Sequence, residues 1–164
     1  LVVREDYTPF YGFEEETAGS AYGGGLFGGD CRKTSVLVST DAAGTSEGTQ
    51  SLTFNFDGVN DGYPYFVVAR SVVRDFYYFC GEMHFDVYNA GAKQHDSYIE
   101  AGGEYVRQSL APASRTTVSL TAEQLAAILS SGEDMMFQIM NEGGTPAYVN
   151  AAFRYYIDNV RGAL

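Results

Sequence analysis

The chain has 164 residues, enough to bury a substantial core and within the range of one domain, which we expect to span residues 1–164. Its 10 basic and 21 acidic residues give a net charge of -11, so a nucleic acid or an anionic membrane surface would be repelled and is not expected as a partner. The 13 tyrosines, 11 phenylalanines and 19 glycines, with no tryptophan, are typical of a β-protein with many tight turns.

Short runs rich in β-branched and aromatic residues, bounded by Gly, Asn, Asp or Pro, predict strands. In chain order these are Thr34–Ser39, Ser51–Phe56, Tyr65–Val73, Asp75–Phe79, Met83–Tyr88, Tyr105–Leu110, Thr116–Leu120, Met135–Met140 and Phe153–Val160. The Asp/Asn/Gly segment 57–62 suits a hairpin turn. The glycine-rich stretch 23–29 lacks the Gly-Lys-Ser/Thr of a phosphate cradle, and we expect a flexible loop there.

One segment has the pattern of a short helix rather than a strand. Thr121 and Gln124 have the spacing of a capping box, and the apolar residues that follow fall on one face. Gly132 suits the left-handed residue that ends a helix. The sequence therefore predicts an all-β protein in which one short helix closes one end of a sandwich.

Little in the chain suits nucleophilic or zinc-dependent catalysis. Neither His84 nor His95 lies near a Gly-x-Ser-x-Gly motif, and two His and two Cys without short spacing do not make a zinc site. A disulfide between Cys31 and Cys80 is compatible with the sequence, which does not decide whether it forms.

The predicted strand around Phe85 has the most polar exposed face. Because side chains alternate along a strand, Met83, Phe85 and Val87 are expected in the core. The residues expected on the opposite face are Glu82, His84, Asp86 and Tyr88. If that face lines a cleft, Glu82 and Asp86 are candidates for the acid and base of a glycosidase. The alternative is an ordinary polar outer face.

Four motifs follow one another along almost the whole chain. They are Phe13-Glu14, Gly48-Thr49-Gln50-Ser51-Leu52, Phe85-Asp86-Val87-Tyr88-Asn89 and Tyr156-Ile157-Asp158-Asn159-Val160. This order resembles the β-sandwich, jelly-roll carbohydrate-binding modules attached to bacterial glycoside hydrolases and cellulosomal proteins. The resemblance implies a jelly roll of two antiparallel sheets that binds a plant or microbial polysaccharide without cleaving it. The Glu-x-Asp-x-x-Glu signature of jelly-roll glucanases is not met, because residue 84 is His.

The resemblance also implies a structural calcium ion, held by an acidic residue after the first Phe and by the Asp of the last strand. The candidate ligands in this chain are Glu14, Glu16 and Asp158. Glu14 and Glu16 share one side of an extended segment, and carboxylate oxygens are ligands that calcium prefers. The alternative is a solvated acidic run.

Many modules of this kind present Trp to the sugar, so in this chain the stacking surface has to come from other residues. The aromatic candidates are Tyr63, Tyr65, Tyr77, Tyr78, Tyr88, Tyr98 and Tyr148. Their candidate polar partners are Glu82, His84, Asp86, Arg107 and Gln138. We expect the site on the sheet face that holds His84 and Tyr88, with the loops around Tyr63 and residues 23–29 as the other location.

The setting of the chain is also implied by the resemblance. Residues 1–6 lack the pattern of a signal peptide and no apolar run is long enough to span a bilayer, so we interpret the sequence as excised from a longer chain. A secreted, modular protein is expected, with this part monomeric. Two other functions stay open: a small jelly-roll glycoside hydrolase or polysaccharide lyase that uses Glu82 and Asp86, and a protein-binding adhesin.

Overall fold

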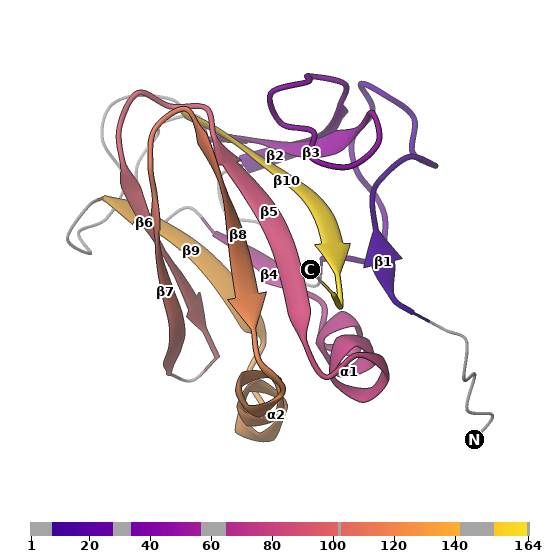
Figure 1. Cartoon of the computed structure of the whole chain (residues 1–164), viewed down its shortest axis with the longest axis vertical. Coiled ribbons are helices and arrows are strands. Elements are labelled where there is room, and N and C mark those ends of the chain that lie inside the picture. Colours follow the sequence, from indigo (N-terminus) through magenta and orange to yellow (C-terminus); the bar gives the residue numbers. More distant parts are fainter. Residues whose placement is uncertain (1–7, 28–33, 57–64, 102, 142–152, 164) are drawn as a thin grey trace.

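Two antiparallel sheets pack face to face in the computed structural model, with two helices at one end of the sandwich (Figure 1). The structure describes residues 8–27, 34–56, 65–101, 103–141 and 153–163. The expected jelly-roll β-sandwich is confirmed.

The first sheet contains the last strand of the chain at its centre. Its strands, in spatial order, are β2 (Thr34–Ser39), β3 (Ser51–Phe56), β10 (Phe153–Arg161), β5 (Met83–Asn89) and β8 (Ser114–Leu120). The short strand β1 (Phe10–Tyr11) also pairs with β10. A register shift between Asp158 and Arg161 marks an irregularity in the β10–β5 pairing.

The second sheet has four strands and lies against the first. Its spatial order is β4 (Tyr65–Val68), β9 (Met135–Asn141), β6 (His95–Glu100) and β7 (Glu104–Leu110). The edge strands of this sheet are therefore β4 and β7.

Helix α2 (Ala122–Ser131) forms as the sequence predicts. The Thr121 hydroxyl accepts from the Gln124 amide, the Gln124 side chain accepts from the Thr121 amide, and Gly132 ends the helix at φ 77°. Arg70, at the start of the other helix, donates to the carbonyl of Leu129 near the C-terminal end of α2 and to that of Glu133 just beyond it. Neither helix of the described part of the chain is long enough and apolar enough to cross a membrane.

Helix α1 (Arg70–Phe79) replaces two predicted strands. The β-branched and aromatic residues of this segment favour a strand by composition, but β4 ends at Val68. Val72, Val73 and Phe76 have helical spacing, and the helix buries all three against the core. The predicted strand Tyr65–Val73 is therefore confirmed over Tyr65–Val68 and wrong beyond it, the predicted strand Asp75–Phe79 is wrong, and the sequence analysis missed this second helix.

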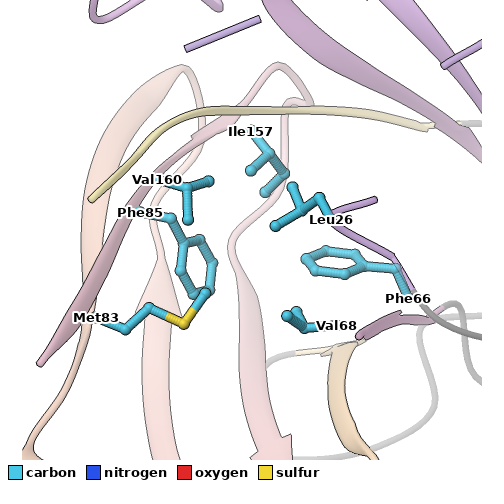
Figure 2. A pocket seen from close by; sticks show the side chains of 7 residues that line it. All are labelled: Leu26, Phe66, Val68, Met83, Phe85, Ile157 and Val160. Atoms are coloured by element: carbon cyan, nitrogen blue, oxygen red, sulfur yellow. The ribbon is translucent and has the colours of Figure 1, made fainter. Parts of the chain in front are cut away.

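The core is filled by apolar side chains from the inner faces of both sheets. Phe66 of β4 stacks on Phe54 of the opposite sheet and on Phe137 of β9, with ring centroids 4.9 and 4.8 Å apart. Leu26 is buried and the Phe27 ring contacts Phe54 and Phe66, so this end of the expected flexible loop is anchored. A small cavity of about 10 Å³ lies in the core. Figure 2 shows the apolar side chains that line it.

Candidate functional site

The outer face of the second sheet presents aromatic and polar side chains from all four strands. Phe66, Ile99 and Phe137 belong to the core between the sheets. Because side chains alternate along a strand, their neighbours in sequence point to the other face. Tyr65 and Gln138, both sequence candidates, therefore share the outer face.

Strand register aligns four of these side chains into one row. Tyr65 pairs with Gln138, Gln138 pairs with Tyr98, and Tyr98 pairs with Arg107. We call these four residues the cross-strand row. At about 4.8 Å between neighbouring strands, the row extends for about 14 Å across the sheet.

The members of the cross-strand row differ in exposure. Arg107 is exposed, and its guanidinium carbon lies 4.3 Å from the centroid of the Tyr98 ring. The Tyr98 side chain is only 2% exposed and Gln138 is 8% exposed, whereas Tyr65 is half-buried. The row is therefore accessible at its two ends, on β4 and β7.

Polar neighbours surround the row on the same face. The Gln138 amide donates to Glu100 Oε2 at 3.0 Å, and the Asp96 carboxylate accepts from the Ser109 hydroxyl at 3.1 Å. Glu100 and Asp96 each lie two residues from Tyr98 along β6, on the same side of the strand. This face therefore combines aromatic rings with fixed hydrogen-bond donors and acceptors.

The outer face of the first sheet is not open as the sequence suggested. Met83, Phe85 and Val87 are in the core as expected, but His84 and Asp86 are buried at 5% and 6% exposure. The loop between β2 and β3, residues 40–50, contacts this face. The expectation that His84 and Asp86 lie on an accessible surface was therefore wrong.

Several contacts hold the β2–β3 loop against the first sheet. The Tyr156 hydroxyl donates to Asp41 at 2.6 Å, and Arg115 of β8 donates to two carbonyls of the loop. Gly44 packs so closely on the Tyr156 ring that an added Cβ would lie 2.1 Å from it. Tyr88, the remaining candidate, is half-buried, with its ring centroid 6.1 Å from that of Tyr156.

Asp86 is saturated with hydrogen-bond donors. Its carboxylate accepts from Ser46 at 2.6 Å, Thr117 at 2.8 Å and Asn159 at 3.2 Å, and pairs with Arg161 at 3.2 Å. Burial raises the pKa of Asp86, but these donors and the Arg161 charge outweigh it and keep the pKa below its usual value. Asp86 therefore acts as an ionised anchor of the fold.

The other members of the polar strand face lie close together. His84 Nδ1 lies 2.7 Å from the Ser119 hydroxyl, and His84 Nε2 lies 3.3 Å from Glu82 Oε2. The Glu82 side chain is 44% exposed. Glu82 and Asp86 thus differ in exposure, and only Glu82 can meet a ligand from solvent.

The remaining aromatic candidates are not on the cross-strand row. Tyr77 is half-buried and Tyr78 is 71% exposed, and both lie on α1 at the end of the sandwich. Tyr63 and Tyr148 lie outside the described residues, as does Cys31, so the structure does not test whether Cys31 pairs with Cys80.

Glu14 ties the N-terminal segment to the β2–β3 loop. Its carboxylate accepts from the amides of Thr49 and Gln50 at 2.7 and 2.8 Å and from the Thr49 hydroxyl at 2.8 Å. These hydrogen bonds, those of Thr49 first, lower the pKa of Glu14. The Gln50 side-chain amide donates to the carbonyls of Phe13, Glu14 and Glu16.

Asp158 is fully buried on β10. Its Oδ2 accepts from the amides of Ser46 and Glu47 at 2.6 and 2.9 Å, whereas its Oδ1 has no partner with hydrogen-bond geometry. Burial raises the pKa of Asp158, although the Glu47, Ser46 and Asn159 amides oppose this. A buried carboxylate oxygen without a partner fits one ligand of a cation.

The three predicted calcium ligands do not form one cluster of side chains. Among the described residues, no three or more His, Cys, Asp or Glu side chains gather as a metal site would require. The Glu14 oxygens face N–H and O–H donors, and Glu16 contributes a backbone carbonyl to Gln50. Asp158 keeps a buried oxygen without a partner, whereas the Glu14 oxygens already accept from donors, and the calcium site stays a prediction.

The sequence analysis missed three polar residues: Ser46, which bonds to Asp86 and Asp158, and Asp96 and Glu100, which lie beside the cross-strand row. Ser46 lies in a loop, and nothing local shows that it reaches Asp86 and Asp158. Asp96 and Glu100 lie on β6, which was not predicted because its His-Asp-Ser start lacks an apolar alternation. The adjacent Tyr98 and Ile99 were the available signal for a strand.

No protein-family model matches the sequence, and no curated protein is significantly similar to it. Solved structures share the fold. A carbohydrate-binding module from the β-sandwich superfamily, studied for promiscuous specificity, aligns with 92% of this chain and 60% of its own at 14% identity and a TM-score of 0.51. An exo-β-agarase aligns with 92% of this chain and 24% of its own at 10% identity and a TM-score of 0.53. The family 22 module of Clostridium thermocellum Xyn10B aligns at 13% identity and a TM-score of 0.48, over 96% of this chain and 92% of its own.

The chain thus has the β-sandwich fold of carbohydrate-binding modules, and the resemblance drawn from the sequence motifs is confirmed at the level of the fold. It spans 60% and 24% of the first two structures that it matches. At these identities the comparisons establish the architecture, to which the cross-strand row adds the chemistry of one face.

Proposed function

We propose that this chain is a non-catalytic carbohydrate-binding module and that a polysaccharide lies across the outer face of its second sheet. The observation that supports this most directly is the cross-strand row, in which register aligns Tyr65, Gln138, Tyr98 and Arg107. All four belong to the aromatic and polar candidates that residue type alone picked out as ligand contacts.

The chemistry of this face suits a sugar chain. A sugar ring has apolar C–H faces, which stack on aromatic rings, and a rim of hydroxyls, which need fixed donors and acceptors. Tyr65 offers a half-buried ring, while Gln138 and Glu100 offer amide and carboxylate groups. A row of about 14 Å matches two or three sugar units.

The charge of the molecule favours an uncharged polysaccharide. A net charge of -11 repels a polyanion, and Asp96 and Glu100 lie on the proposed face beside Arg107. We expect modest affinity, with Kd on the order of micromolar to millimolar, because polar sugars lose water on binding.

The absence of catalysis is part of the proposal. A glycosidase needs two carboxylates that can exchange a proton with substrate or water. Asp86 is buried and accepts from Ser46, Thr117 and Asn159, which leaves Glu82 without a competent partner on this strand. Hydrolysis of a polysaccharide that disappears in Glu82→Gln would favour the glycoside hydrolase or lyase alternative.

We also propose the setting that the sequence motifs implied. The chain would act in a secreted, modular protein, as a monomeric unit that brings an appended enzyme or complex to its polysaccharide. A structural calcium ion, bound by Asp158, would hold the β2–β3 loop; the unpartnered Oδ1 of that residue supports this.

The test is binding to a panel of neutral oligosaccharides and polysaccharides, measured by calorimetry: β-1,4-galactan, xylan, mannan, cellulose and agarose fragments. Replacing a stacking ring typically costs about 1 kcal/mol, so Tyr65→Ala should weaken binding about fivefold or more, and Gln138→Ala should also weaken it. The matched control is Tyr78→Ala, which removes a 71% exposed ring on α1 and should bind like the parent chain.

Three outcomes would contradict the proposal. If Tyr65→Ala and Gln138→Ala both bind as tightly as the parent, the site lies elsewhere. If Tyr78→Ala alone loses binding, the glycan contacts α1. If no glycan binds and a specific protein partner does, the chain is an adhesin domain.

A further inference from the structure

The Tyr98 ring is covered by another member of the cross-strand row. The Arg107 guanidinium lies over the ring at 4.3 Å from its centroid, within the range of a cation–π contact. Tyr98 is 2% exposed as a result of this and its other contacts. A sugar cannot stack on the face of this ring that the guanidinium covers.

Tyr98 occupies a central position on the face. It lies on β6, between Gln138 of β9 and Arg107 of β7, whereas Tyr65 lies on the edge strand β4. A glycan that follows the row from β4 must cross β6 before it reaches β7. It therefore meets Arg107 over the most central aromatic ring of the row.

We propose that Arg107 is an internal occupant of the sugar-stacking position on Tyr98 and that a bound glycan displaces it. This inference rests on the proposed function and adds a means by which the chain limits its own affinity. The closed and open positions of Arg107 form an equilibrium, and only the open one exposes the ring. The apparent affinity falls by the fraction of molecules that are open.

The surroundings of Arg107 allow this movement. Its side chain is exposed and unbranched, and β7 is an edge strand of the second sheet, so no further strand confines it. Asp96 and Glu100 flank Tyr98 on the same face and offer negative charge to a displaced guanidinium. The side chain therefore can leave the ring without entering an apolar region.

The first test is Arg107→Ala, assayed with the tightest binder among β-1,4-galactotriose, xylohexaose, mannohexaose and cellohexaose. A cation–π contact of ordinary strength predicts about fivefold tighter binding, the equivalent of about 1 kcal/mol. The matched control is Arg74→Ala, which removes an exposed positive charge from α1 and should leave the affinity unchanged. Weaker or unchanged binding in Arg107→Ala would overturn the proposal and make Arg107 a ligand contact or a bystander.

A second measurement does not depend on any variant. Protons of the Arg107 side chain that lie over the Tyr98 ring should resonate upfield in the NMR spectrum of the free protein. Titration with the same oligosaccharide should move them to ordinary positions as the guanidinium leaves the ring. Upfield positions that persist at saturation would show that the contact survives binding, and the displacement would be refuted.

The two proposals fail in different ways. If no oligosaccharide of the panel binds to the parent chain or to Tyr65→Ala, the proposed function itself is wrong. If the parent binds and Tyr65→Ala does not, but Arg107→Ala gains no affinity, only the displacement is wrong.

Discussion

At the scale of single residues, a buried histidine links the two sheets through a hydrogen bond. His95 of β6 and Tyr155 of β10 are both buried, and His95 Nδ1 is hydrogen-bonded to the Tyr155 hydroxyl. Burial lowers the pKa of His95, as does the charge of Lys93, while Asp96 opposes them. The fold therefore favours the neutral imidazole.

This pKa shift predicts a loss of stability in mild acid. Between the lowered pKa of the folded state and about 6.5 in the unfolded state, the unfolded chain binds more protons. The free energy of unfolding should therefore fall as the pH decreases below about 6.5, by at most about 1.4 kcal/mol per pH unit from this group. Urea unfolding of the parent and of His95→Gln at pH 7.5 and 5.5 measures this change in the free energy of unfolding.

The parent should lose more stability than the variant between these two pH values, because carboxylates contribute equally to both. Tyr155→Phe is the control for the hydrogen bond, and should lower stability by about 1 kcal/mol at pH 7.5. Identical pH dependence in the parent and His95→Gln would contradict the assignment.

Residue 48, in the second sequence motif, has to be glycine for a steric reason. Gly48 has a φ of 65°, and an added Cβ would lie 2.4 Å from Oε1 of Glu14, the carboxylate that holds the β2–β3 loop. Gly19 has a φ of 80° but no heavy atom within 4 Å of such a Cβ. An alanine at either position would strain the backbone, but only at residue 48 would its Cβ also clash with Glu14.

Gly48→Ala should therefore destabilise the protein more than Gly19→Ala does. The backbone conformation alone costs about 1–2 kcal/mol in either variant, and displacement of Glu14 adds to this cost in Gly48→Ala. Thermal melts of both variants make the comparison. Equal losses would mean that Glu14 adjusts freely and does not anchor the loop.

At the scale of elements, the β2–β3 loop explains the largest error of the sequence interpretation. Alternation within β5 is a local property, and it correctly placed Met83, Phe85 and Val87 in the core. What covers the opposite face is not local, because the loop arrives from two other strands and bonds to Asp86 through Ser46. Polar side chains that bind a loop and polar side chains that face solvent look alike in a sequence.

The cross-strand row is a second case in which the arrangement of residues could not be predicted from local sequence. Tyr65, Gln138 and Arg107 were found by residue type alone, but their alignment depends on the register of four strands. One of those strands, β6, was not predicted. Helix α1 was missed because residues with high β-propensity fold as a helix when the core accepts Val72, Val73 and Phe76.

Calcium remains a prediction that belongs to the same loop. A ligand bound only by the folded state adds about 2.7 kcal/mol at a hundred times its Kd, which raises the melting temperature by several degrees. Chelation should therefore lower the melting temperature of the parent, and Asp158→Asn should abolish the difference. Glu16→Gln is the control, because only the Glu16 backbone carbonyl contacts Gln50. A melting temperature that changes with neither calcium nor chelator would exclude the site.

At the scale of the whole molecule, the placement of β10 constrains how the chain reaches its native state. The strand pairs with β1, β3 and β5, so segments from the first and middle thirds of the sequence meet on it. Such distant pairings close large loops before they gain contacts, which is typical of folding in milliseconds to seconds rather than microseconds.

The order of synthesis adds a second constraint. Until residues 153–161 leave the ribosome, β3 and β5 each have an unpaired edge where β10 will insert. The apolar side chains on their inner faces cannot be fully buried before then. Unpaired edges of this kind invite pairing between nascent chains. The central position of β10 thus means that the first sheet cannot be completed until residues 153–161 have been synthesised.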